Sequence, residues 1–443
     1  MSGATQGLSE RVATRRAAHR PIVVAVGATG GLHALRVARA LATRDETSVV
    51  VVSVVEPPAV YTFETSRALL LPWLVEQQLI QRHETVHDRL RRIGATYDPY
   101  GEPDIEVRYG GAGDTIAAVA REMNARLIVT GIGPHALRHR LLSAGTAWAT
   151  SRHARCPVLA VAEQARDRAR VAVIATDFSP ESIHAAKTAL PLLADGAVVY
   201  LVHAWSRVHA AFPSAQLALL NEAYAASLPE QFDRFRAALA PLDDITLQTL
   251  TLEGRPAELV LAVVRAKHAD LIVAGTHGRG AVERWLLGST SSALLRGADC
   301  SVLLAPAPPV VERLRLLRCM SGTSTTRAPE QWDAELQAFA QRNRDRRTVL
   351  EIDDLSIGAQ VQETGFALVG AAYDPRDRHV ALMFGRRAAD GAHLTRSLAN
   401  VRTVAVTSGP RDADRALYIE SDGGNALLTF LDEPSSAAPS VNA

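Results

Sequence analysis

The sequence predicts an α/β protein built of two doubly wound, five-stranded parallel-sheet domains in tandem, followed by a small antiparallel α+β domain. Three observations predict this. Short, almost continuously apolar segments alternate with helical segments through the first two thirds of the chain. Residues 126–160 align without a gap to residues 270–304. After residue 306 the pattern changes to short strands separated by turns. Apolar strands that alternate with helices are typical of parallel sheets covered on both faces.

The aligned segments show that the chain contains one unit twice. Gly131 corresponds to Gly275 and Cys156 to Cys300, an offset of 144 residues in both cases (275 − 131 and 300 − 156). A unit of that length is a whole domain, so the repeat is a tandem duplication and not a short-period solenoid. We call residues 20–163 copy one and residues 169–307 copy two.

The expected elements follow the same order in both copies. Copy one contains strands at 22–27, 48–55, 105–110, 127–131 and 158–161, with helices at 32–42, 67–93 (broken near Pro72) and 114–123. Copy two contains strands at 171–176, 197–205, 245–252, 271–275 and 302–305, with helices at 180–193, in an insert that ends at 240, at 257–267 and at 291–296. The two closing strands are expected to pair within the chain, because an unpaired edge strand is generally avoided.

The last third of the chain has a different character. A polar linker at 308–327 precedes a helix that begins at Pro329 and carries Trp332, Leu336 and Phe339 on one face. Strands are expected at 349–352, 359–362, 366–373, 379–384 and 404–406, and 416–420 and 426–430 flank a hairpin turn at Asp422-Gly423-Gly424-Asn425. This predicts a small α+β domain over 328–432, with a disordered leader at 1–19 and a disordered tail at 433–443.

Composition excludes several classes of protein. The formal net charge is +1, so no global basic face points to nucleic acid. Lys187 and Lys267 are the two lysines of the chain, and no P-loop sequence occurs. No apolar run reaches the length of a membrane span. The three cysteines, Cys156, Cys300 and Cys319, form no pair or metal-ligand spacing, which suits a reducing cytoplasm and buried structural thiols. We therefore expect a cytoplasmic protein without nucleic-acid or membrane partners.

The stretch from Gly275 to Thr290 carries the strongest functional signal. Gly275 ends an apolar strand, Gly278 follows after two intervening residues, and Gly288, Ser289 and Thr290 open a helix. Glycines let backbone N–H groups approach a phosphate, and a helix N-terminus favours negative charge. Asp177 ends the first strand of copy two, so it is expected at the same edge of the sheet, where ligands of such folds bind.

This spacing, with Asp177 upstream, resembles the nucleotide-binding motif of the universal stress protein family. The resemblance covers about residues 20 to 306. It implies an adenine nucleotide alpha hydrolase-like fold with strand order 3-2-1-4-5, and ATP as ligand. It also implies that the two glycines and the later Gly-Ser contact the phosphates and ribose, and that the aspartate lies by the adenosine end. The C-terminal region is more loosely similar to a small uncharacterised bacterial domain through its Trp-containing helix and the strand Gly358-Ala359-Gln360-Val361.

Copy one departs from this pattern. Pro134 stands where copy two has Gly278, and Ala144 and Gly145 replace Gly288 and Ser289. The first strand ends at Gly27, without a carboxylate. Because proline has no N–H to offer and fixes φ, we expect copy one to bind ATP weakly or not at all.

Other residues near the motif have weaker signals. Arg279 is expected to place a guanidinium on a phosphate, with a solvent-exposed loop position as an equal alternative. His277 could contact a phosphate when protonated or act in proton transfer, but a solvent-exposed loop position without such a role is favoured for it. No catalytic array or protein-ligated metal is expected, and Mg²⁺ would accompany ATP, held mainly by phosphate and water.

Three functional hypotheses remain open at this point. The leading one is a stress protein that binds ATP in copy two and acts through its bound state and not as a fast enzyme. The second is a slow ATP hydrolase or nucleotide transferase. The third is a scaffold that binds no nucleotide and recruits partners through its C-terminal domain. The partner of that domain and a homo-oligomeric state stay open.

Overall fold

The computed structural model describes residues 20–27, 31–56, 72–94, 104–132, 140–206, 215–242, 244–276, 288–309, 312–313, 315–316, 323–326, 328–354, 358–385, 393–408, 413–422 and 424–431. The two α/β copies, apart from residues 225–240, form one compact unit, and the C-terminal domain belongs to a second one. Each unit is treated by itself below.

Both copies have the expected alternation of strands and helices. Copy one contains β1 (Ile22–Ala25), α2 (Leu32–Arg44), β2 (Val49–Val55), α3 (Pro72–Gly94), β3 (Asp104–Tyr109), α4 (Ala112–Glu122), β4 (Leu127–Gly131), α5 (Arg140–His153) and β5 (Val158–Val161). Copy two contains β6 (Ala169–Thr176), α6 (Pro180–Ala189), η3 (Leu190–Leu192), β7 (Leu193–Trp205), α7 (Ala215–Leu239), β8 (Thr246–Glu253), α8 (Pro256–Lys267), β9 (Leu271–Gly275), α9 (Ser289–Gly297) and β10 (Ser301–Ala305).

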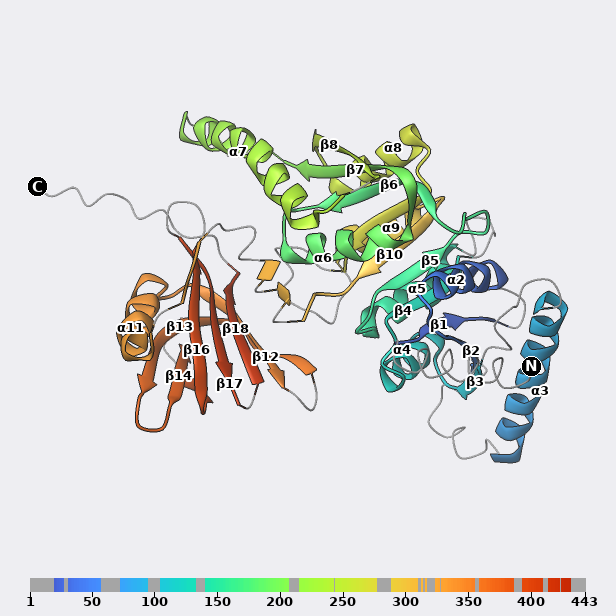
Figure 1. Ribbon diagram of the computed structural model, residues 1–443, viewed down its shortest axis with the longest axis horizontal. Coiled ribbons are helices and arrows are strands. Elements are labelled where there is room, and N and C mark those ends of the chain that lie inside the picture. Colours follow the sequence, from blue (N-terminus) through green and yellow to red (C-terminus); the bar gives the residue numbers. More distant parts are fainter. Residues whose placement is uncertain are drawn as a thin grey trace, which may run out of the picture. The chain divides into compact units, whose positions relative to one another are not determined.

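The sheet of each copy has the strand order 3-2-1-4-5, as β3-β2-β1-β4-β5 and β8-β7-β6-β9-β10. Neighbouring strands within a copy run parallel, and Figure 1 shows helices on both faces of the sheet. The central strands β1 and β9 are almost completely buried because their valine, leucine and isoleucine side chains meet helices on either side. The predicted fold class is confirmed.

The closing strands β5 and β10 join the two sheets into one sheet of ten strands. They pair antiparallel, with Leu159 opposite Leu303. These two residues are related by the duplication offset, since 303 − 159 = 144, so the junction is a pseudo-twofold pairing of like with like. Trp148 of α5 lies across the same axis and donates its indole N–H to Ser292 Oγ of α9 at 3.2 Å, a pair that is also separated by 144 residues. The expected intrachain pairing of the closing strands is confirmed.

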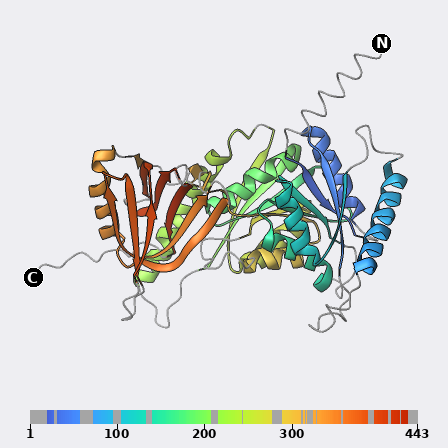
Figure 2. The same ribbon diagram turned by 90° about the horizontal axis from the view of Figure 1, so that it is seen from below.

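The C-terminal domain is an antiparallel sheet with a helix on one face (Figures 1 and 2). Its elements are β11 (Thr323–Thr326), η4 (Pro329–Gln331), α11 (Trp332–Arg342), β12 (Arg347–Asp354), β13 (Gly358–Asp374), β14 (His379–Gly385), β15 (His393–Leu398), β16 (Val401–Ser408), β17 (Asp414–Ser421) and β18 (Gly424–Phe430). The sheet order is β11-β16-β17-β18-β12-β13-β14-β15. Trp332, Leu336 and Phe339 pack α11 onto the sheet, as their helical spacing predicts.

The arginines that follow this helix hold it to the sheet. Arg342 Nε donates to the buried carboxylate of Asp414 at 2.9 Å, and this carboxylate raises the pKa of Arg342. Arg346 donates to the backbone carbonyl of Asp414 at 2.9 Å, and its guanidinium lies 3.7 Å from the centre of the Phe430 ring. These two arginines therefore have a structural role.

Three strands of this domain differ from the sequence prediction. β11 lies inside the segment predicted as a linker, because its four polar residues give no apolar alternation and it pairs at the sheet edge with β16. β13 is one strand and not two, since β12 pairs with it through the predicted break, at Glu363 and Thr364, and again at Ala367 after a register shift. β15 was missed because four of its six residues are polar.

Within the described part of the chain, no helix is both long and apolar enough to span a membrane. Cys156 is buried and Cys300 half-buried, and both are free thiols. Burial raises the pKa of Cys156 to about 11 and that of Cys300 to about 12. Both thiols stay protonated near neutral pH, which fits the structural role expected of them.

Candidate functional site

The carboxyl ends of β6 and β9 form the rim at which the sequence places a ligand. The two strands are neighbours and run parallel, with Ile174 opposite Val273, so Thr176 and Gly275 end at the same level. Asp177 follows Thr176 directly. The structure therefore brings Asp177 and Gly275 to one edge of the sheet, as predicted.

Asp177 is held in a tight turn that starts α6. Its Oδ1 accepts hydrogen bonds from the Ser179 N–H at 3.1 Å and from the Ser179 hydroxyl at 2.5 Å. Ser179 Oγ in turn accepts from the Ser182 N–H at 3.2 Å and caps the helix, with Pro180 at its first position. This turn fixes the direction of a half-buried carboxylate at the rim.

The segments on either side of the glycine loop meet at the same rim. The Gly288 N–H donates to the Thr276 carbonyl at 2.9 Å, and Ser291 Oγ donates to the Gly275 carbonyl at 2.6 Å. Thr276 is itself anchored through its N–H to the Ala305 carbonyl at 2.8 Å. The N-terminus of α9 is therefore fixed beside the end of β9.

α9 begins without a side-chain cap. Gly288 is extended, with φ −54° and ψ 149°, and no side-chain hydrogen bond caps the helix there. The first N–H groups of an α-helix have no carbonyl partner within the helix. In α9 these belong to Ser289, Thr290 and Ser291, since the Ser292 N–H makes the bond to the Gly288 carbonyl. Such a terminus, together with the helix dipole, is suited to an anion.

The middle of the motif, including Gly278 and Arg279, lies outside the described residues, as does His277. Their expected contacts with phosphate are untested. Of the seven predicted site residues, the structure describes Asp177, Gly275, Gly288, Ser289 and Thr290, and it gathers all five at the rim formed by β6, β9 and α9.

Copy one has a different helix start at the equivalent place. α5 begins at Arg140, which corresponds to residue 284, so it starts five positions earlier than α9. Gly145 and Thr146, the counterparts of Ser289 and Thr290, therefore lie inside a helix, where N–H groups bond to carbonyls four residues earlier. Ala144 favours the helix at the position where Gly288 opposes it. The amides that copy two presents to the rim are used internally in copy one.

His33 packs against the end of β4 at the rim of copy one. Its Nε2–H donates to the Val161 carbonyl at 3.1 Å, and a Cβ placed on Gly131 would lie 2.8 Å from this nitrogen. The imidazole thus lies against the glycine that corresponds to Gly275. Burial lowers the pKa of His33, so the neutral ring is favoured.

These observations can now be set beside known proteins. The model of the universal stress protein family matches residues 18–162 and, a second time, residues 169–306. The chain belongs to the universal stress protein family. The model of a family of unknown function (DUF5335) matches residues 325–440, so the chain contains two stress protein domains in tandem and a C-terminal domain of that second family.

Curated stress proteins match parts of the chain. One from Thermus aquaticus, named for the QAH/OAS sulfhydrylase 3'region, is 42% identical over 76 residues, or 17% of this chain and 56% of the relative. One from Mycobacterium tuberculosis strain H37Rv is 28% identical over 217 residues, or 46% of this chain and 65% of the relative. The chain thus spans less than two thirds of the length of these relatives.

Solved structures of universal stress proteins are similar to parts of the chain. A universal stress protein from Archaeoglobus fulgidus covers 65% of this chain and 96% of its own, with 16% identity and a TM-score of 0.44. A universal stress protein crystallised in complex with cAMP covers 32% of this chain and 99% of its own, with 26% identity and a TM-score of 0.24.

A histidine that sequence reasoning missed supports the rim of the second stress protein domain. His203 is 4% exposed; its Nδ1–H donates to the Thr176 carbonyl at 2.8 Å, and its Nε2 accepts from the Tyr224 hydroxyl at 2.9 Å. Phe178 packs on the imidazole with ring centres 4.5 Å apart. The signal in the sequence was a lone polar residue in the apolar strand Leu201–Ala204. Through this bond His203 fixes the backbone directly before Asp177.

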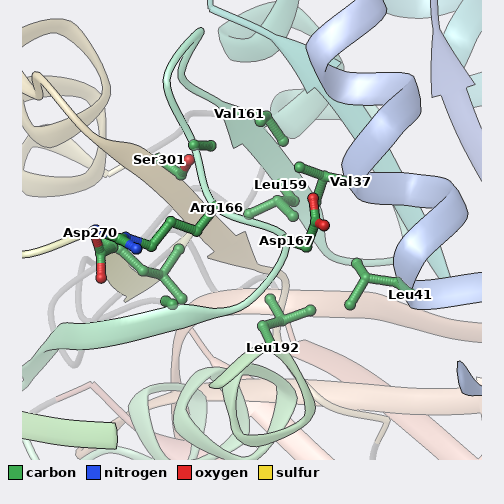
Figure 3. Close-up of a pocket in the computed structure, with 12 residues that line it drawn as sticks. Val37, Leu41, Leu159, Val161, Arg166, Asp167, Leu192, Asp270 and Ser301 are labelled. Carbon is green, nitrogen blue, oxygen red and sulfur yellow. The ribbon is translucent and has the colours of Figure 1, made fainter. Parts of the chain in front are cut away.

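A small cavity between the two stress protein domains lies away from this rim. It measures about 30 Å³ and is lined in part by Leu41, Leu159 and Leu192, with Arg166 and Asp270 at its polar side (Figure 3). Asp270 precedes β9 and accepts from the Arg170 and Val171 N–H groups at 2.8 and 3.1 Å, so the cavity lies at the amino ends of β6 and β9. A space of this size holds about one water molecule and no nucleotide.

Proposed function

We propose that the second stress protein domain binds ATP, with Mg²⁺ accompanying it, and that the protein is a nucleotide-dependent regulator of the cytoplasmic stress response and not a fast enzyme. The observation that carries this proposal is the uncapped N-terminus of α9 beside the Asp177 turn at one rim of the sheet. In the first stress protein domain Gly27 stands in place of Asp177, and α5, the counterpart of α9, already begins at Arg140, so we assign ATP binding to the second domain alone.

The proposed contacts follow from the chemistry of each group. The N–H groups of Ser289 and Thr290 and the hydroxyl of Ser289 face the phosphates, with the amides around Gly275, Gly278 and Gly288 completing the cradle. A hydrogen bond from an amide to a charged phosphate contributes about 1.5 to 3 kcal/mol. Arg279 adds a guanidinium, and Asp177 accepts from the adenosine end. Mg²⁺ is held by phosphate oxygens and water, because it keeps much of its hydration shell.

We assign a regulatory role and not rapid catalysis because of the residues in the glycine motif at 275–290. Rapid phosphoryl transfer needs a group that positions the attacking water, and the motif offers amides and hydroxyls but no lysine. We therefore expect bound ATP to be hydrolysed slowly.

Two measurements on the full chain test the proposal. Equilibrium dialysis with labelled ATP and Mg²⁺ should find about one nucleotide per chain, because one of the two duplicated rims is open to an anion. A stoichiometry of two would place a site in the first domain as well, and no binding would leave a scaffold that acts through its C-terminal domain. Release of labelled phosphate, measured on the same sample, should be slow; rapid multiple turnover would make the protein an ATP hydrolase.

A further inference from the structure

Helix α3 of copy one carries a sequence that neither the fold nor the nucleotide rim uses. Residues 83–87 read His-Glu-Thr-Val-His, with two histidines four positions apart and a glutamate after the first. On a helix, histidines at this spacing lie on one face, where they can bind one zinc ion, and the glutamate lies next to the metal-bound water. In the corresponding helix of copy two, α7, the sequence contains no histidine.

The structure places both rings side by side. The ring centres of His83 and His87 are 6.1 Å apart, and the ring planes differ by 16°. Two imidazoles bound to one tetrahedral zinc ion at Zn–N distances of about 2.1 Å have ring centres roughly 5 to 5.5 Å apart, and the plane of each ring contains the ion. The two stacked rings are therefore near enough to share an ion, and both side chains must rotate to direct a nitrogen at it.

The helix presents this pair at its solvent side. Val86 is fully buried and orients the helix on the domain. With about 100° of turn per residue, His83 and His87 lie on one flank of Val86, and Glu84 lies further toward solvent. His83 and Glu84 are exposed and His87 is half-buried, so a cation can reach the pair. Thr85 bonds its own helix, from its hydroxyl to the Gln81 carbonyl at 2.7 Å, and contributes no ligand.

We propose that His83 and His87 form a binding site for a borderline divalent cation, with zinc as the best fit, and that water completes the coordination. No group of three or more metal-binding side chains occurs among the described residues, so the protein supplies two nitrogen ligands and the site is open. Glu84 accepts a hydrogen bond from the metal-bound water. This replaces the expectation, drawn from the sequence, of no protein-ligated metal.

The test is zinc titration by calorimetry on the full, metal-stripped chain at neutral pH. The expected result is one site that weakens at least about tenfold in His83→Ala or His87→Ala and is lost in the double variant. Glu84→Gln should retain it, because a water ligand and not the glutamate completes the shell. His268→Asn is the matched control: it removes an exposed imidazole elsewhere and suits the left-handed backbone at that position, φ 50°.

Proton NMR of the histidine rings identifies the ligands independently of affinity. Zinc should shift the ring signals that the His83→Ala and His87→Ala spectra assign to these two residues. Acidification should release the ion, because imidazole ligands must be neutral. The proposal is overturned if the wild-type chain binds no zinc, or if the double variant, with its helical circular dichroism retained, binds zinc as the wild type does.

Discussion

The two stress protein domains have the same strand order and pair through equivalent residues, yet they differ at the rim where a ligand is expected. In copy two a helix begins at Ser289, directly at the rim, whereas in copy one the equivalent residues lie inside α5. Copy two has the carboxylate of Asp177, where copy one has Gly27. His33 lies against Gly131 of copy one. A duplicated sheet can therefore keep its core while a few substitutions change what its rim offers to an anion.

The helix start is the most informative of these differences. Gly288 and Ala144 occupy the same position of the repeat, and alanine is the better helix former by about 1 kcal/mol. The chemical capacity of the rim thus depends on where one helix begins. The following predictions transfer features between the copies or remove them.

The largest effect is expected when copy two receives the loop residues of copy one. Gly278→Pro with Gly288→Ala should extend α9 backward and remove backbone amides from the cradle. Since each lost bond to a charged group costs about 1.5 to 3 kcal/mol, ATP affinity should fall at least about a hundredfold. Calorimetry measures this loss of affinity.

The reverse change in copy one, Pro134→Gly with Ala144→Gly, should create no second ATP site because Gly27 supplies no carboxylate. A second bound ATP would contradict the proposed difference between the two rims.

A single amide can be removed without moving the helix. Ser289→Pro places proline at the first helical position, where it is tolerated, and the extended backbone of Gly288 suits a residue before proline. ATP affinity should fall about tenfold, the loss of one bond to a charged group. Ser289→Ala keeps the amide and should have a clearly smaller effect. Equal affinities of the two variants would mean that this amide does not contact the nucleotide.

The junction between the copies should show a moderate effect on stability. Trp148→Phe removes the hydrogen bond from the indole N–H to Ser292 Oγ and should lower the free energy of unfolding by about 1 kcal/mol. Urea unfolding followed by circular dichroism measures it. Because Ser292 lies in the first turn of α9, ATP affinity should be checked in the same variant. An unchanged unfolding free energy would show that this bond adds nothing to the pseudo-twofold junction.

The smallest effect is expected on the pH dependence of the free energy of unfolding. Burial is the main cause that lowers the pKa of His33, with Arg36 acting in the same direction and Glu163 and the bond to Val161 opposing. The folded state therefore binds a proton less readily than the unfolded state, whose histidine pKa is about 6.5. The contribution of neutral His33 to stability is therefore fully present above pH 6.5, and it is lost as the pH falls through the pKa that His33 has in the folded state. His33→Gln should flatten the decrease of the urea midpoint between about pH 7.5 and pH 5. An identical pH profile of variant and wild type would rule out this role.

Most of the fold could be predicted because its signals are local. Apolar runs marked the parallel strands, the 144-residue offset marked the duplication, and Asp422–Asn425 marked the β17–β18 hairpin. The predictions failed where pairing overrode composition, as in the polar strands β11 and β15, whose formation depends on a neighbouring strand.

The residues of the candidate site could also be predicted only in part. Glycine and hydroxyl residues after a buried strand were enough to predict Gly275, Gly288, Ser289 and Thr290 as one feature, and the parallel topology added Asp177. The sequence could not reveal that His203 supports this rim through Thr176 and Tyr224, or that His33 closes the other one against Val161, which is 128 residues away.

The amino-acid sequence by itself determined the duplication, the parallel sheets and the residues of the anion motif, because each is encoded by neighbours along the chain. Tertiary structure alone decided the register that joins Leu159 to Leu303 and the contact of His33 with the rim of copy one. The physical reason is that these features depend on contacts between segments distant in sequence. The secondary-structure propensity of a single segment does not include the free energy of such contacts.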